Sequence, residues 1–181
     1  MNENTLYAEY ISGSDKALEK LMEIYGDKLT LYINGYVKNI HDAEELMIDV
    51  FAYIVVKRPS IKTSFNNYVY KAARNYALAF LRRKKKVLFP VNEIADFSIE
   101  AAFENAAELK ERDMSLYSCL DMLSSSQKEV LYLVYIENMS YKETAAVLNK
   151  TVKQIDKLLQ LGKKKIKPLL EKEGITGAFN S

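Results

Sequence analysis

The residues best suited to chemistry in this sequence are lysines and a glutamine spaced along one predicted helix near the C-terminus. Lys153, Lys157, Gln160 and Lys164 fall at positions i, i+4, i+7 and i+11, so a helix would carry them on one face. Such side chains contact phosphates and base edges in the major groove of DNA. A solvated surface face is the ordinary alternative, because lysine stripes are common on helices. The neighbouring residues must decide between the two interpretations.

Those neighbours have the spacing of a helix-turn-helix. Ala145 is small enough for two helices to approach each other, and Asn149, four positions later, tolerates the positive φ of a tight turn. A second helix would bury the stripe formed by Ile155, Leu158, Leu159, Gly162 and Ile166. The pattern predicts a helix-turn-helix from about Ser140 to Ile166, with Ser140 and Glu143 as a capping box and the lysine face toward duplex DNA.

A second chemical pattern is acidic. Asp42, Glu45 and Asp49 share one face of a predicted helix, beside Glu44, and carboxylates in this arrangement suit a divalent cation or general acid and base chemistry. The sequence offers no second acidic motif and no glycine-rich phosphate loop to complete such a site. We therefore predict no catalytic residue, no metal site and no cofactor. Acidic residues in a first helical turn ordinarily stabilise the helix dipole, and a protein-binding surface is the better functional interpretation.

A third pattern mixes cations, amides and rings. A helix beginning near Phe65, with Ser64 as its N-cap, would place these residues on its outer side: Asn67, Tyr70, Lys71, Arg74, Asn75 and Arg82, with Tyr68 at the flank. Single-stranded nucleic acid is bound by charges along its backbone and by aromatic faces under its bases. The tyrosines could equally lie at the edge of a core, with the basic residues stabilising the helix C-terminus. From the residues alone the two interpretations are balanced.

The remaining elements follow from apolar periodicity and indicate an all-α fold. One or two helices occupy the stretch from Ala17 to Tyr36, where Gly26 and Gly35 are candidate breaks. The next helix, from Asp42, would bury Ala43, Leu46, Met47, Val50, Phe51 and Ile54. The helix after Ser64 would bury Phe65, Val69, Ala72, Tyr76, Ala79 and Phe80. Ser126 with Glu129 fits a further capping box.

Charge divides the chain into basic, acidic and basic stretches. From Lys57 to Lys86 there are ten basic residues and no acidic one, whereas from Glu93 to Asp113 seven acidic residues stand against two basic ones. We therefore expect two small helical domains, an N-terminal helical bundle over 1–86 and a C-terminal helix-turn-helix domain over 113–175, joined by an acidic linker over 87–112. No apolar run is long enough to span a membrane and no signal peptide is visible, so we expect a cytoplasmic protein without membrane insertion.

Three stretches of the chain resemble the extracytoplasmic-function group of bacterial sigma factors, within the sigma-70 family. DAEELMIDVF, from Asp42 to Phe51, is similar to the helix by which this family binds core polymerase. SFNNYVYKAARNYALAFLRRKKK resembles the helix that meets the minus-10 promoter element. LDMLSSSQKEVLYLVYIENMSYKETAAVLNKTVKQIDKLLQLGKKKIKPLL resembles the fourth region, which binds the minus-35 element.

The resemblance implies a non-enzymatic alternative sigma factor that binds core RNA polymerase and promoter DNA and directs transcription initiation. By its motifs, the polymerase clamp helices would meet Asp42, Glu45, Leu46, Asp49 and Val50. The melted minus-10 strand would meet the loop from Lys57 to Asn66 and the following helix, through Lys62, Asn66, Asn67, Tyr68, Lys71, Arg74, Asn75 and Arg82. The minus-35 duplex would meet Lys150, Thr151, Lys153, Gln154, Lys157, Gln160 and Lys164.

The sequence departs from the family pattern at several positions. Tyr68 stands where tryptophan is usual, Ser124 replaces a common proline, and Asn149 replaces the usual turn glycine. Members of the group are often held by an anti-sigma protein, and no residue here identifies one. A helix-turn-helix regulator that binds an operator without polymerase is the alternative function, and a metal-dependent hydrolase using the acidic helix is a third.

Overall fold

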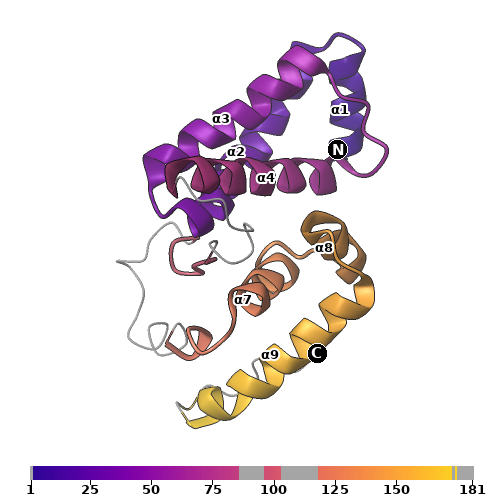
Figure 1. The fold of residues 1–181 in the computed structure, drawn as a ribbon. Helices are drawn as coiled ribbons and strands as arrows, with labels where there is room; N and C mark the ends of the chain where they lie inside the picture. Colours follow the sequence, from indigo (N-terminus) through magenta and orange to yellow (C-terminus); the bar gives the residue numbers. More distant parts are fainter. Residues whose placement is uncertain (1, 86–95, 103–117, 173, 175–181) are drawn as a thin grey trace. The chain divides into compact units, whose positions relative to one another are not determined.

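The structure, a computed structural model, describes residues 2–85, 96–102, 118–172 and 174. Every element named in those ranges is a helix, which confirms the prediction of an all-α protein (Figure 1). The chain divides into two compact units, Met1–Ala95 and Asp96–Ser181. In the described part of the chain, no helix has both the length and the apolarity needed to cross a membrane.

Four helices build the first unit. They are α1 (Glu3–Ile11), α2 (Asp15–Val37), α3 (Ile40–Lys57) and α4 (Phe65–Lys85). Helix α2 is central, because it packs against each of the other three (Figure 1). It runs unbroken through Gly26 and Gly35, the two positions at which the sequence allowed a break in the helix. Its buried stripe continues past both glycines, so tertiary packing outweighs their low helix propensity.

The helix predicted from Asp42 forms as α3, and its ends are set by a side-chain cap and by a left-handed residue. Asn39 caps its start by accepting hydrogen bonds from the backbone N–H groups of His41 and Asp42, at 3.0 and 3.1 Å. Arg58 follows its last residue in the left-handed conformation, with φ 43°. The predicted stripe is buried except for the half-buried Met47.

Helix α4 is rotated from the orientation predicted by the sequence. Its fully buried residues are Phe65, Val69, Tyr70, Ala73, Ala77 and Leu81. The predicted outer residue Tyr70 is 1% exposed and packs its ring 5.4 Å from that of Tyr32. Ala72, Tyr76, Ala79 and Phe80 are only half-buried. A tyrosine is compatible with a core position or a surface position, so the α4 pattern alone did not fix the helix rotation.

The second unit is also helical. It contains α7 (Ser125–Leu131), the π-helical segment η2 (Tyr132–Ile136), α8 (Tyr141–Leu148) and α9 (Val152–Lys172). The capping box of α7 is formed by Ser124 and Gln127, which exchange hydrogen bonds of 3.0 and 3.2 Å. The predicted box of Ser126 with Glu129 is therefore wrong, and Glu129 is 4% exposed instead.

Residues 96–102 belong to the core of the second unit. Phe97, Ile99 and Ala102 are buried, and the Phe97 ring lies 5.4 Å from that of Tyr132. The Phe97 N–H donates to Ser125 Oγ at 2.8 Å, next to the start of α7. This part of the predicted linker over 87–112 is thus packed, and the second unit begins before the predicted residue 113. The linker residues 87–95 and 103–112 lie outside the described residues.

We predict that Phe97→Ala destabilises the second unit by about 3 to 5 kcal/mol, because it leaves a cavity beside Tyr132. Urea unfolding followed by helical circular dichroism measures the loss, and hydrogen exchange in α7 and α9 assigns it to this unit. Met122→Ala is the control, since Met122 is 56% exposed in the same unit. Equal unfolding midpoints for the two variants would contradict the placement of Phe97 in the core.

Candidate nucleic-acid interface

The helix-turn-helix predicted near the C-terminus is present as α8, a short turn and α9. Ser140 and Glu143 form the predicted capping box of α8, with hydrogen bonds of 2.8 and 3.1 Å. Asn149 adopts the left-handed conformation, with φ 54° and ψ 46°. The Lys150 N–H closes the turn on the carbonyl of Ala145 at 2.9 Å, and Ala145 is 6% exposed. The turn is therefore fixed by backbone bonds as well as by packing.

Helix α9 is held by one apolar face against α7 and α8. The residues of that face are Ile155, Leu159, Gly162, Ile166 and Leu170. The predicted stripe is confirmed, with Leu158 half-buried at its edge. Because this face is buried, the rotation of α9 about its own axis is fixed.

The opposite face of α9 carries the predicted polar row. Lys153, Lys157, Gln160 and Lys164 are all exposed, and they extend over about 16 Å of helix. Three ammonium groups and one amide thus project from a rigid scaffold. An array of this length and charge fits the phosphates and base edges of a major groove.

The start of α9 adds polar groups to this row. Thr151 and Gln154 form a capping box that the sequence reading did not identify, with hydrogen bonds of 2.8 and 3.1 Å. The Oε1 atom of Gln154 accepts from the Thr151 N–H, so its amide nitrogen is the group that can donate to a ligand. Lys150 is half-buried beside them. The positive end of the α9 dipole lies at this cap and favours a phosphate.

A second basic face lies on α4 in the first unit. Lys71, Asn75 and Arg82 are exposed on it, and Tyr68 is half-buried at its flank. Arg74 is held inward, since its Nε donates to the Tyr36 hydroxyl at 3.1 Å. These residues give α4 a cationic outer surface with an aromatic edge.

The amides at the start of α4 are also tied to the bundle. The Tyr25 hydroxyl donates to Asn66 Oδ1 at 3.1 Å, and the Asn67 N–H donates to Ser64 Oγ at 3.1 Å. Ser64 is thus the predicted N-cap of α4. Within the described residues, the Oδ1 atom of Asn67 is buried without a hydrogen-bond partner. Asn66 and Asn67 are therefore less available to a ligand than the sequence suggested, whereas Lys62 is exposed in the preceding connection.

Tyrosines join the α4 surface to α3. Burial raises the pKa of Tyr68, and the neighbouring phenols of Tyr53 and Tyr76 add to that effect. Burial also raises the pKa of Tyr76, with further contributions from Asp49 and Tyr53. The phenols of Tyr68 and Tyr76 therefore stay neutral at physiological pH, and their rings present apolar faces. Tyr53, which is 43% exposed, was missed by the sequence analysis because its place beside α4 depends on helix packing.

The outer face of α3 is acidic and apolar. Glu45 and Asp49 are exposed, whereas Asp42 is partly covered and lies 3.8 Å from the ammonium group of Lys84. The structure corrects the placement of two other predicted contact residues. Leu46 and Val50 are 3% and 1% exposed, so they pack in the bundle and cannot present their side chains to a partner.

Exposed aliphatic side chains on α3 replace the buried Leu46 and Val50 as candidate contact residues. Ile48 is 55% exposed and Val56 is 74% exposed, and both lie opposite the buried stripe of the helix. The sequence signal was available, because apolar residues on the polar side of an amphipathic helix indicate a protein-binding surface. The candidate protein surface is therefore a mixture of carboxylates and aliphatic side chains.

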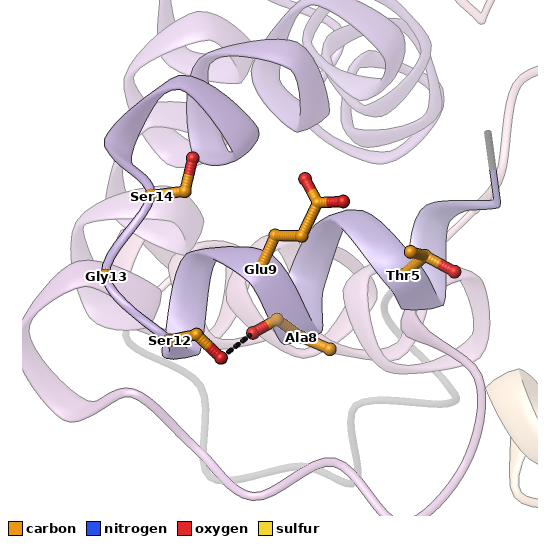
Figure 2. A pocket seen from close by; sticks show the side chains of 6 residues that line it. All are labelled: Thr5, Ala8, Glu9, Ser12, Gly13 and Ser14. Carbon is orange, nitrogen blue, oxygen red and sulfur yellow. Dashed lines mark hydrogen bonds between the residues drawn. The ribbon is translucent and has the colours of Figure 1, made fainter.

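The described residues contain no cluster of acidic, histidine or cysteine side chains that could hold a metal ion. A shallow hollow lies between α1 and the start of α2 (Figure 2), lined by Thr5, Ala8, Glu9, Ser12, Gly13 and Ser14. The Ser12 hydroxyl donates to the carbonyl of Ala8 at 2.9 Å, and Glu9 is the one charged residue of the lining. This hollow has no paired acid and base or nucleophile arrangement.

Comparison with known proteins finds similarity to bacterial sigma factors. Residues 113–166 match the family described as sigma-70, region 4. The chain is 22% identical over 170 residues to the ECF RNA polymerase sigma factor SigW of Bacillus subtilis, covering 87% of this chain and 91% of SigW. It is 27% identical over 157 residues to the RNA polymerase sigma factor SigZ of the same organism, covering 85% of this chain and 87% of SigZ.

Solved structures show the same fold. The chain matches CnrH, solved in complex with the cytosolic domain of CnrY, with a TM-score of 0.64 and 21% identity over 94% of this chain and 97% of that one. It also matches the sigma factor RpoE of Bartonella quintana, solved with the anti-sigma factor NepR, with a TM-score of 0.63 and 17% identity over 86% of this chain and 98% of that one. Residues 113–166 thus match region 4 of the sigma-70 family, and most of the chain is similar to sigma factors of the extracytoplasmic-function group.

Proposed function

We propose that this chain is an alternative sigma factor, which binds core RNA polymerase and directs it to specific promoters. The observation that carries the proposal is the presence of two differently built basic faces in one chain. The face on α9 is a row of flexible cations suited to a duplex, whereas the face on α4 sets cations beside aromatic rings. A protein that binds DNA while its strands separate needs both kinds of surface.

In the second unit, the α9 row and its cap would bind the minus-35 duplex. The residues assigned to this contact are Lys150, Thr151, Lys153, Gln154, Lys157, Gln160 and Lys164. Lysines position the helix on the phosphates, and the Gln160 amide and the free nitrogen of Gln154 can read base edges. Gln154 would act as a donor, because its oxygen is occupied by the cap.

In the first unit, α4 and the connection before it would meet the minus-10 element as it melts. Lys62, Lys71, Asn75 and Arg82 are the exposed members of the predicted set, with Tyr68 as its aromatic member. Asn66, Asn67 and Arg74 would act mainly by positioning, because each is engaged or buried within the bundle. An unstacked base gains contact energy from a ring of this kind.

The outer face of α3 would bind the clamp helices of core polymerase. Glu45 and Asp49 supply charge there, and Ile48 and Val56 supply apolar area, while Leu46 and Val50 hold the helix in the bundle. We further propose that the chain does no catalysis of its own, acts in the cytoplasm, and is held by an anti-sigma protein in the absence of its signal. The complex of RpoE with the anti-sigma factor NepR supports that last step as an analogy.

The central prediction is that the purified chain makes core RNA polymerase start transcription at defined sites. Mapping transcript starts on fragmented genomic DNA with core polymerase, with and without the chain, measures this. The chain alone should bind duplex DNA weakly. If core polymerase continued to initiate at random, and the chain alone bound a palindromic operator tightly, the helix-turn-helix regulator would replace the sigma factor.

A second prediction concerns the α9 row. Lys153→Ala/Lys157→Ala should weaken binding to the minus-35 duplex and reduce the slope of log affinity against log salt by about 0.9 for each lost phosphate contact. The matched control is Lys167→Ala/Lys172→Ala, which removes the same charge from exposed positions at least about 15 Å further along α9. A slope that stays the same in the first variant would place the DNA on another face of the helix.

A third prediction concerns the surface of α3. Glu45→Lys/Asp49→Lys should weaken core polymerase binding by about tenfold or more, because like charges would meet across the interface. Glu19→Lys/Glu23→Lys on α2 is the control, with the same spacing, exposure and charge change. Fluorescence anisotropy of labelled chain titrated with core polymerase measures both. Equal losses for the two variants would indicate a general effect of net charge rather than a contact through α3.

A further inference from the structure

The connection between α3 and α4, residues 58–64, is held at both ends by α1. At its start, the Tyr7 hydroxyl donates a hydrogen bond of 2.6 Å to the carbonyl of Pro59. The guanidinium group of Arg58 lies 5.0 Å from the centre of the Tyr10 ring, a cation–π contact. Two residues of α1 thus fix the point where the chain leaves α3.

At its other end, the connection is held by Asn4. The Asn4 Oδ1 atom accepts the Phe65 N–H at 2.7 Å, at the first residue of α4. That amide has no acceptor within its own helix, so the bond acts as a cap supplied from a distant segment. The Tyr7 ring lies 5.2 Å from the Phe65 ring and joins the two anchored ends.

The aromatic rings in these contacts are shielded from water. Tyr7, Tyr10 and Phe65 are 7%, 2% and 1% exposed. Burial, reinforced by the neighbouring phenols of Tyr68 and Tyr10, raises the pKa of Tyr7 to about 12, so its hydroxyl remains a donor at physiological pH. In contrast, Lys62 and Thr63 in the middle of the connection are exposed. The two ends of the 58–64 connection are therefore fixed by α1, and its middle is exposed to solvent.

We propose that α1 is a positioning element for promoter melting, in which Asn4, Tyr7 and Tyr10 hold the 58–64 connection in the conformation that meets the separated minus-10 strand. This inference rests on the proposed function of the chain. A connection ordered before DNA arrives loses less conformational entropy when it captures a strand. Helix α1 would then tune strand capture without touching DNA or polymerase.

The test uses holoenzyme formed from core polymerase and the variant Asn4→Ala/Tyr7→Phe. Each change removes one hydrogen bond. Both retain the fold, since Asn4 is exposed and phenylalanine keeps the buried ring of residue 7. We expect binding of a single-stranded oligonucleotide carrying the non-template minus-10 sequence to fall about fivefold for each lost bond. Permanganate reactivity of the promoter should fall in parallel.

Two further variants separate positioning from general damage. Thr5→Ala is the matched control, because Thr5 neighbours Asn4 but lines the hollow of Figure 2. Asn4→Asp alone keeps an acceptor for the Phe65 N–H and should bind the single strand as well as the unmodified chain does. A merely structural role would lower the thermal midpoint and core polymerase affinity together with single-strand binding, whereas positioning leaves core affinity and minus-35 duplex affinity unchanged.

The outcomes distinguish this inference from the function on which it rests. If the unmodified chain did not direct initiation by core polymerase, the proposed function would fail and the inference with it. If the unmodified chain directed initiation but the double variant bound the single strand equally well, only the inference would be overturned. Strand binding by Asn4→Asp as weak as that of Asn4→Ala would also contradict the role assigned to the cap.

Discussion

Burial of a single apolar face on α4 and on α9, the two helices that we propose bind DNA, is the constraint on which the remaining surfaces depend. On α9, Ile155, Leu159 and Ile166 are fully buried against α7 and α8, and this burial fixes the helix rotation. Lys153 and Lys157 then project to the far side, where both are exposed. Their charge is placed by apolar packing, which is why a lysine row can be both precisely located and flexible at its tips.

The same constraint operates on α4 with a different result. Its buried face includes Tyr70, so the helix is turned to bring Tyr68 and Tyr76 to the boundary with α3. The rings at that boundary are half-buried and remain neutral, while Lys71 and Arg82 stay exposed beyond them. Packing therefore generates a mixed surface here, in contrast to the uniform row on α9, and this difference matches the two states of DNA that we propose the surfaces bind.

Features set by local chemistry were predictable from the sequence, and features set by partners distant in the chain were not. The capping box of α8 and the left-handed turn at Asn149 depend on neighbouring residues, and the structure confirms both. By contrast, the burial of Phe97 depends on Ser125 and Tyr132, and α1 is a nine-residue helix anchored through contacts with α2 and α4. Leu46 and Val50 were assigned to an interface by motif, although their helical phase already indicated a core position.

The organisation of the first unit suggests how a small chain can contribute to strand separation without an energy source. Capturing a base with an unordered seven-residue connection would cost about 1 kcal/mol or more for each residue fixed. In this chain, the bond from Tyr7 to Pro59 and the cap from Asn4 to Phe65 restrict that connection during folding instead. The entropy cost is then offset by burial of the Tyr7, Tyr10 and Phe65 rings, and in the proposed complex the binding energy from the DNA would remain available for unstacking the base.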